Sequence, residues 1–105
     1  MQQTDLTLKE IMDQLESRTS PYPLCLLVNE LGTIAMETQS PDEADEATAK
    51  LCEVLQNGGD KNEQFAAYGH LKLFLGYRPG VKDAVSAFEA DPAKADIVRK
   101  FTENY

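Results

Sequence analysis

The 105-residue sequence has few of the side chains that most often carry out catalysis, with one histidine and two cysteines. His70 has no cysteine near it and no acidic residue at metal-ligand spacing, so we expect a structural or surface histidine. Cys25 and Cys52 show neither a CxxC pattern nor metal-ligand spacing. We expect two small apolar side chains in a reducing compartment, the alternative being a disulfide between them. No catalytic triad can be built without His70, so the sequence predicts no catalytic residue, no cofactor and no metal site.

Long hydrophobic runs are also missing. The longest, Leu24–Val28, is far too short to cross a bilayer. The first ten residues, MQQTDLTLKE, have neither the basic nor the apolar part of a secretory signal. We therefore expect a cytoplasmic protein without a membrane partner. Alternation of apolar and polar residues is too brief for a strand, and its nearest case, TIAMET at 33–38, is interpreted as the frayed end of a helix.

Basic residues are outnumbered by acidic ones, 10 to 18, which gives a net charge of −8. The imbalance lies in residues 1–64, with 13 acidic and 4 basic residues, whereas residues 65–105 have 5 acidic and 6 basic ones. An acidic surface repels nucleic acid and anionic lipid, so neither is an expected partner. A basic protein or peptide fits this charge, and the alternative is that the acidity only keeps the protein in solution.

The five prolines all stand where a helix can begin. Proline is accepted in the first helical turn, where the backbone N–H groups lack intrahelical partners, and is harmful further along. Capping boxes begin at Thr7, Ser40 and Asp60, each with a glutamate three residues later. Three prolines directly follow an N-cap residue, at Ser20-Pro21, Ser40-Pro41 and Asp91-Pro92.

Glycines mark the helix ends. Asn57-Gly58-Gly59 predicts a left-handed C-cap, and Gly76 is expected to end the helix before it. The chain is therefore expected to form a single all-α domain, residues 1–105. Its six predicted helices span residues 7–18, 21–35, 41–57, 61–76, 79–90 and 92–103.

The helix predicted over 61–76 has the widest apolar surface. Ala67, Tyr68, Leu71, Phe74 and Leu75 share one face, so Phe74 and Leu75 are expected in the core. Further apolar side chains lie round the helix from this face. A helix of this kind packs against neighbours on more than one side.

The pair Leu75-Gly76 recurs as Leu31-Gly32, 44 residues earlier, each time followed by an amphipathic segment. Recurrence at this period indicates stacked helical hairpins. Residues 51–91 resemble a HEAT or armadillo-like repeat in their paired leucines, Asn/Asp-rich turn, alanine pair and Leu-Gly. The resemblance implies three antiparallel helix pairs in an α-α superhelix whose grooves bind proteins. A tetratricopeptide-like adaptor is an alternative, because DAVSAFEADP is similar to the second helix of that repeat.

We expect a non-catalytic protein-binding or scaffold module, and the alternative from another class is a small helical enzyme subunit. The expected state is a monomer or weak self-association. A cation site at the cluster that follows Pro41 is disfavoured, because acids at a helix start stabilise the helix dipole. Tyrosine and arginine together on a turn are typical of interfaces, the alternative being that Tyr77 only covers the edge of the helix stack. The candidate protein-binding residues are therefore Asp42, Glu43, Asp45, Glu46, Tyr77 and Arg78.

Overall fold

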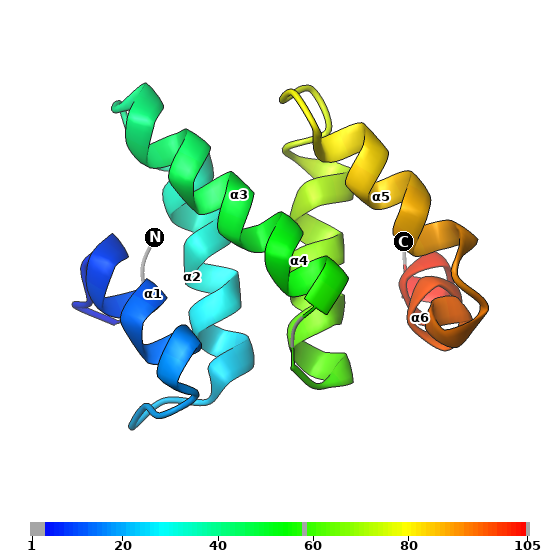
Figure 1. Ribbon diagram of the computed structural model, residues 1–105, viewed down its shortest axis with the longest axis horizontal. Coiled ribbons are helices and arrows are strands. Elements are labelled where there is room, and N and C mark those ends of the chain that lie inside the picture. Colours follow the sequence, from blue (N-terminus) through cyan, green and yellow to red (C-terminus); the bar gives the residue numbers. More distant parts are fainter. Residues whose placement is uncertain (1–3, 58, 105) are drawn as a thin grey trace.

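The structure, a computed structural model, describes residues 4–57 and 59–104, and this part contains six α-helices and no strand (Figure 1). The all-α prediction is confirmed. No helix in the described part is both long enough and apolar enough to cross a membrane. The helices are α1 (Leu8–Ser17), α2 (Leu24–Glu37), α3 (Pro41–Asn57), α4 (Lys61–Leu73), α5 (Val81–Ala90) and α6 (Ala95–Asn104), with a short 3-10 helix η1 (Pro92–Lys94) before α6.

Helix α4 lies at the centre of the arrangement. It contacts α2, α3, α5 and α6, which confirms that a helix apolar all round packs on several sides. In Figure 1, α2 and α4 stand side by side, α3 crosses in front of them, and α5 continues beside α3. Helix α1 packs against α2 and α3 at the opposite end of the molecule from α6.

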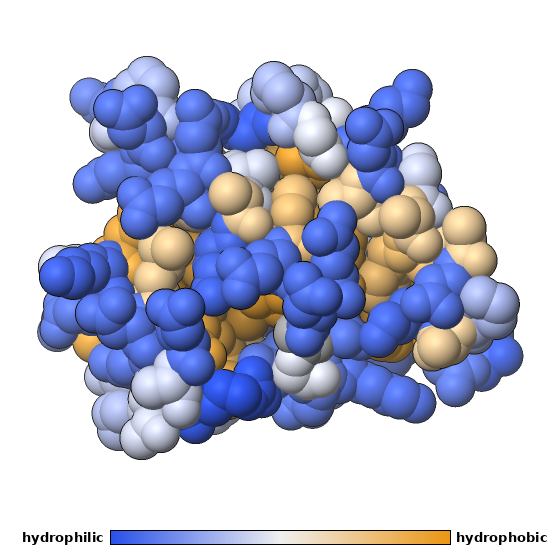
Figure 2. Space-filling view, viewed as in Figure 1, coloured by the Kyte–Doolittle hydropathy of each residue, from blue (hydrophilic) through white to orange (hydrophobic). Residues whose placement is uncertain are grey.

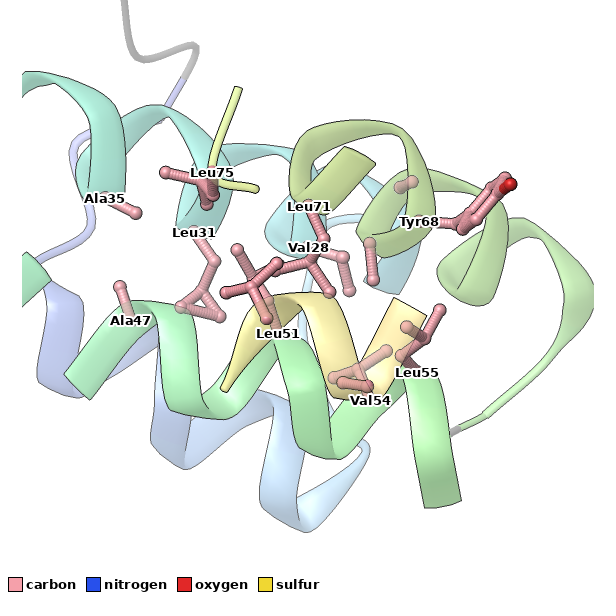
Figure 3. Packing of buried hydrophobic residues seen from close by; sticks show 14 of the residues in the cluster. Val28, Leu31, Ala35, Ala47, Leu51, Val54, Leu55, Tyr68, Leu71 and Leu75 are labelled. Carbon is pink, nitrogen blue, oxygen red and sulfur yellow. The ribbon is translucent and has the colours of Figure 1, made fainter. Parts of the chain in front are cut away.

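The core lies where α2, α3 and α4 meet (Figure 3). Val28 and Leu31 of α2 face Leu51 and Leu55 of α3, and Leu71 of α4 closes the cluster. All five side chains are fully or almost fully buried. Each such side chain contributes about 1.5–3 kcal/mol to the free energy of unfolding, so this contact holds the three helices together.

Helix α4 ends three residues earlier than predicted, and this changes the direction in which the Phe74 side chain points. The backbone leaves the helical conformation at Phe74, where φ is −122°. Leu75 therefore turns into the core and is 0% exposed, as predicted. Phe74 points outward and is 50% exposed, so its placement in the core was wrong.

Three predicted helix starts are also corrected. Helix α2 begins at Leu24 and not at residue 21, because a residue that precedes proline, here Tyr22, disfavours the helical conformation. Helix α5 begins at Val81, after the left-handed Gly80 with φ of 83°. The segment predicted as one helix over 92–103 consists of η1 and α6.

Leu31-Gly32 does not end a helix, since both residues lie inside α2. It is therefore not equivalent to Leu75-Gly76, which follows α4. Gly32 has a packing role instead: a Cβ built at this position would overlap the ring of His70. The recurrence thus marks two different local structures.

The turn between α3 and α4 is organised by the side chain of Glu63. Helix α3 ends at Asn57 as predicted, and of the two glycines predicted to form a left-handed cap, Gly59 has a φ of 43° while Gly58 lies outside the described residues. The Asp60 carboxylate accepts a hydrogen bond from the Glu63 N–H, and the Glu63 carboxylate accepts one from the Asp60 N–H, both at 2.9 Å. This capping box is confirmed, as is the one at Thr7 and Glu10.

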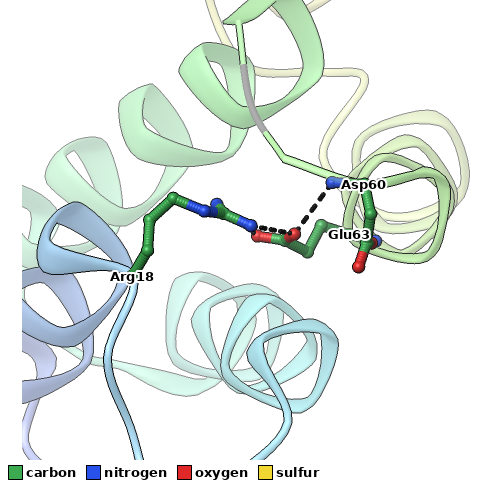
Figure 4. A network of polar contacts seen from close by, with 3 residues as sticks. All are labelled: Arg18, Asp60 and Glu63. Atoms are coloured by element: carbon green, nitrogen blue, oxygen red, sulfur yellow. Dashed lines mark hydrogen bonds and ion pairs between the residues drawn. The ribbon is translucent and has the colours of Figure 1, made fainter.

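Glu63 also binds Arg18, at the C-terminal end of α1 (Figure 4). The two guanidinium nitrogens donate to the two carboxylate oxygens over 3.0 and 2.8 Å. The Glu63 side chain is 1% exposed. The hydrogen bonds from Arg18 lower the pKa of the Glu63 carboxyl and outweigh its burial, which acts in the opposite direction. One buried carboxylate thus joins α1 to the start of α4.

We predict that Glu63→Gln lowers the free energy of unfolding by about 1–3 kcal/mol near neutral pH, because a charge-assisted hydrogen-bond pair is lost. Since the folded-state pKa of Glu63 is lowered, its contribution is full above the unfolded-state pKa and is lost as the pH falls through the folded-state pKa. The difference in unfolding free energy between the variant and the unchanged protein should therefore become smaller at acidic pH. Urea unfolding between about pH 7 and pH 3 measures this.

The control for this experiment is Glu103→Gln, a change at an exposed position of α6. It should leave stability almost unchanged at both ends of the range. A deficit for Glu63→Gln that is equal at neutral and acidic pH would contradict the assignment of stability to the charged carboxylate.

Candidate functional site

The two regions singled out in the sequence meet in the structure. Arg78, on the turn after α4, donates from Nη1 to Oδ1 of Asp45 on α3 over 2.7 Å. The Arg78 side chain is 20% exposed, whereas that of Asp45 is 71% exposed. The buried Arg78 Nε has no hydrogen-bond partner in the described part of the chain. The contact therefore fixes the turn against α3 and leaves most of the carboxylate open to a partner.

This contact borders a cleft of about 430 Å³ between α3 and the turn, which we call the acidic cleft. Gly80 forms part of the turn wall, and a Cβ there would meet no atom within 4 Å, so this wall leaves room beside the backbone. On this face hydrophilic side chains predominate over α3, whereas hydrophobic ones are more frequent over α5 (Figure 2). The cleft is lined by Asp45, Thr48, Ala49, Cys52, Glu53, Gln56, Arg78, Pro79 and Gly80.

The predicted acidic residues divide into two groups. Asp42, Asp45 and Glu46 are exposed on α3 together with Glu53, which the sequence analysis did not select. Glu43 instead accepts a hydrogen bond from Thr38 Oγ1 over 2.9 Å, at the start of the helix. Glu53 was missed because it lies outside the local cluster of acidic residues in the sequence. It follows Glu46 by about two helical turns, and this spacing could have shown that it lies on the same side of α3.

The start of α3 forms only half of its predicted capping box. Ser40 Oγ accepts a hydrogen bond from the Glu43 N–H over 3.3 Å, as expected. The Ser40 N–H donates to Thr38 Oγ1 over 3.2 Å, in place of the expected bond to the Glu43 carboxylate. Glu43 therefore stabilises the start of the helix, and it does not line the acidic cleft.

Tyr77 lies beside the cleft and is 75% exposed. The Arg78 guanidinium carbon is 5.7 Å from the centre of its ring, within the range of a cation–π contact. The exposed Tyr77 and the largely buried Arg78 thus lie together next to the acids of α3.

A second hollow, of about 380 Å³, lies between α2, α4 and α6, and we call it the apolar groove. Its α4 residues occupy the side opposite Ala67 and Leu71, so the groove faces away from the core and from α3. Sequence reasoning assigned this side of α4 to packing and did not recognise a groove. It is lined by Cys25, Asn29, Asn62, Phe65, Ala66, Gly69, His70, Leu73, Phe74 and Phe101.

His70 joins the groove to the core. Its ring packs against Gly32 of α2 and lies 6.0 Å from the ring of Phe74, measured between centroids. Burial lowers the pKa of His70. Its Nδ1 is buried and has no hydrogen-bond partner within the described residues. These contacts agree with a histidine that packs two helices together.

The cysteines are unpaired and partly buried, which excludes the disulfide alternative in this structure. Cys25 lines the apolar groove and Cys52 lines the acidic cleft. Burial raises the pKa of the Cys52 thiol, so that thiol is less readily ionised than an exposed one. Across residues 4–57 and 59–104, no group of three or more His, Cys, Asp or Glu side chains is arranged to hold a metal ion.

No protein-family model, no curated protein and no solved structure matches this chain. Its function is therefore argued from the acidic cleft and the apolar groove.

We predict that Gly32→Ala and Gly69→Ala have opposite effects, although both are glycine-to-alanine changes inside helices. The methyl group at position 32 would overlap the His70 ring, so this variant should lose about 1–3 kcal/mol of unfolding free energy. At position 69 the methyl would lie 3.7 Å from Phe101, an ordinary contact. Removing a helical glycine there should stabilise the protein by about 0.5–1 kcal/mol.

Thermal and urea unfolding of the two variants measure this difference. The double variant Gly32→Ala with His70→Ala should recover part of the loss, because the smaller side chain makes room for the added methyl. Equal stability of the two single variants would show that His70 and Gly32 are not in close contact.

Proposed function

We propose that the protein is a non-catalytic protein-binding module whose acidic cleft receives a basic segment of a partner. The observation that supports this proposal most directly is the 2.7 Å contact between Arg78 and Asp45. It holds the turn against the acidic side of α3, and both residues line the cleft. Asp42 and Glu46 add exposed negative charge along the same helix, and Glu53, whose side chain is 59% exposed, pairs with Lys50 over 3.2 Å. Opposite charge speeds encounter with a basic partner and selects against acidic ones.

The proposed scaffold is an α-α superhelix of three hairpins, α1–α2, α3–α4 and α5–α6. Contacts between α2 and α4, between α4 and α6, and between α3 and α5 support this order, because stacked hairpins bring every second helix together. The resemblance to HEAT and armadillo-like repeats supports the same scaffold. Such stacks offer extended surfaces to partners, and a tetratricopeptide-like adaptor would use its surface in a similar way.

The geometry of the cleft indicates the spacing of the partner's charges. Asp45 and Glu53 are eight residues apart on α3, or about 12 Å along the helix axis. An extended peptide covers this distance in roughly four residues. Basic side chains at positions i and i+4 of an extended segment would therefore reach both carboxylates, each of which would then be shared with a cation of this chain, Arg78 at Asp45 and Lys50 at Glu53.

The enzyme alternative would use the apolar groove, which both Cys25 and His70 border. A cysteine nucleophile needs a hydrogen bond to its base. Within the described contacts, His70 Nδ1 bonds to no group, and its ring is held against Gly32. The geometry therefore supports binding better than catalysis. The unpaired cysteines fit the reducing environment of the proposed cytoplasmic location.

We predict that a fluorescein-labelled peptide with arginine or lysine at every fourth position, among glycine and serine, binds this protein. The variant Asp42→Asn, Asp45→Asn, Glu46→Gln, Glu53→Gln should bind it about tenfold more weakly, because the cleft and the exposed surface of α3 beside it lose their negative charge. Affinity should also fall between about 50 and 500 mM salt, since exposed charges are screened. Fluorescence anisotropy measures both effects.

The matched control changes four exposed acids outside the cleft to amides, at Asp5, Asp13, Asp83 and Glu103. It alters the net charge by the same amount, so it separates attraction to the cleft from attraction to the whole protein. An equal loss in both variants, or affinity independent of salt, would contradict the proposal and leave the acidity as a solubilising feature.

A further inference from the structure

The apolar groove is free of charged side chains along its lining, although 27% of the residues in the chain are charged. Leu73 is 46% exposed and Phe74 is 50% exposed, and both contribute to it. Exposed apolar patches bordered by polar residues mark binding surfaces in proteins. Phe65 and Phe101 add aromatic rings, which are enriched among the residues that dominate interface energies.

The shape of the groove fits a helix. Its floor follows α4 from Asn62 to Leu73, which spans about 17 Å, or three helical turns. Ala66 and Gly69 are small and lie in the middle of this floor, with larger side chains towards both ends. Small residues let a second backbone approach closely. Side chains from α2 and α6 form the two walls.

The charged residues near Phe65, at one end of the groove, indicate which charge a bound helix would carry. Asn62 and Phe65 also line an adjoining hollow of about 190 Å³ with Lys61, Asp96, Ile97 and Lys100.

Two cations share one carboxylate at this end, and a third lies over an aromatic ring. Asp96 lies 3.8 Å from Lys61 and 3.0 Å from Arg99, while the Lys100 ammonium lies 5.1 Å from the centre of the Phe65 ring. The positive excess favours an acidic group placed beside the groove.

We propose that the apolar groove binds an amphipathic helix of a partner protein, with an apolar stripe in the groove and an acidic residue over Lys61 and Lys100. The buried Nδ1 of His70, which has no partner among the described atoms, adds a polar group at the groove wall. This site lies on the side of α4 away from α3, so it is separate from the acidic cleft and prefers the opposite charge. It does not rest on the function proposed for the cleft.

The test uses a labelled synthetic helix of about 14 residues, with leucines at i, i+3, i+4 and i+7 and glutamates in its first turn. A matched helix carries lysines in place of the glutamates. Titration of ¹⁵N-labelled protein should shift the amide signals of Asn62, Phe65, Gly69 and Leu73. The glutamate helix should bind about tenfold more tightly than the lysine helix.

Two sets of variants locate the site. Phe74→Asp should weaken binding about tenfold or more, whereas Met36→Asp, a similar change of an exposed apolar side chain outside the groove, should not. Lys61→Glu with Lys100→Glu should reverse the preference between the two helices. Circular dichroism confirms that each variant is folded.

Three results would overturn the proposal. The first is no saturation with the glutamate helix below about 1 mM. The second is binding that Phe74→Asp leaves unchanged. The third is self-association of the free protein in sedimentation experiments that Phe74→Asp abolishes, which would assign the groove to a second copy of this chain.

Discussion

The buried carboxylate of Glu63 ties three parts of the chain together. Glu63 caps its own helix through Asp60 and binds both terminal nitrogens of Arg18, so a single side chain fixes the end of α1, the turn before α4 and the first turn of α4. A Cβ at Gly59 would overlap this carboxylate, so the turn also needs a glycine beside it. Because a buried carboxylate is costly without partners, these contacts depend on one another. These contacts tie the start of α4 to α1, while the apolar core holds α4 against α2 and α3, and both candidate binding surfaces are built around α4 or the turn that follows it.

The position of α4 explains why the molecule has two surfaces of different chemistry. One side of α4 carries Leu71 into the core shared with α2 and α3. The opposite side forms the floor of the apolar groove, next to a group of cations on α4 and α6. The turn after α4 brings Arg78 to Asp45 and borders the acidic cleft. Two partners of opposite charge could therefore occupy the protein together, which is the property expected of a scaffold.

Local chemistry made much of this fold predictable. Two capping boxes, at Thr7 and Asp60, were confirmed, because each depends on residues three positions apart. Phe74 was misplaced because helical spacing was extended past the point where the backbone leaves the helix. Contacts between residues far apart in the sequence could not be predicted from local patterns. Arg18 binds Glu63, which is 45 residues away in the sequence, and Arg78 binds Asp45, which is 33 residues away. The candidate acidic residues were found from their local density, but the cleft beside them and the role of Glu53 required the packing of α3 against the turn.

The most direct test of the two-surface account is a ternary titration followed by NMR. Labelled protein is first saturated with the synthetic glutamate helix, and the basic peptide is then added. The account predicts that the basic peptide shifts signals of α3 and of residues 77–80, while the signals of the groove residues keep their helix-bound positions. It also predicts the same affinity for the basic peptide with and without the helix. Displacement of one peptide by the other, or shifts from both on the same residues, would contradict it.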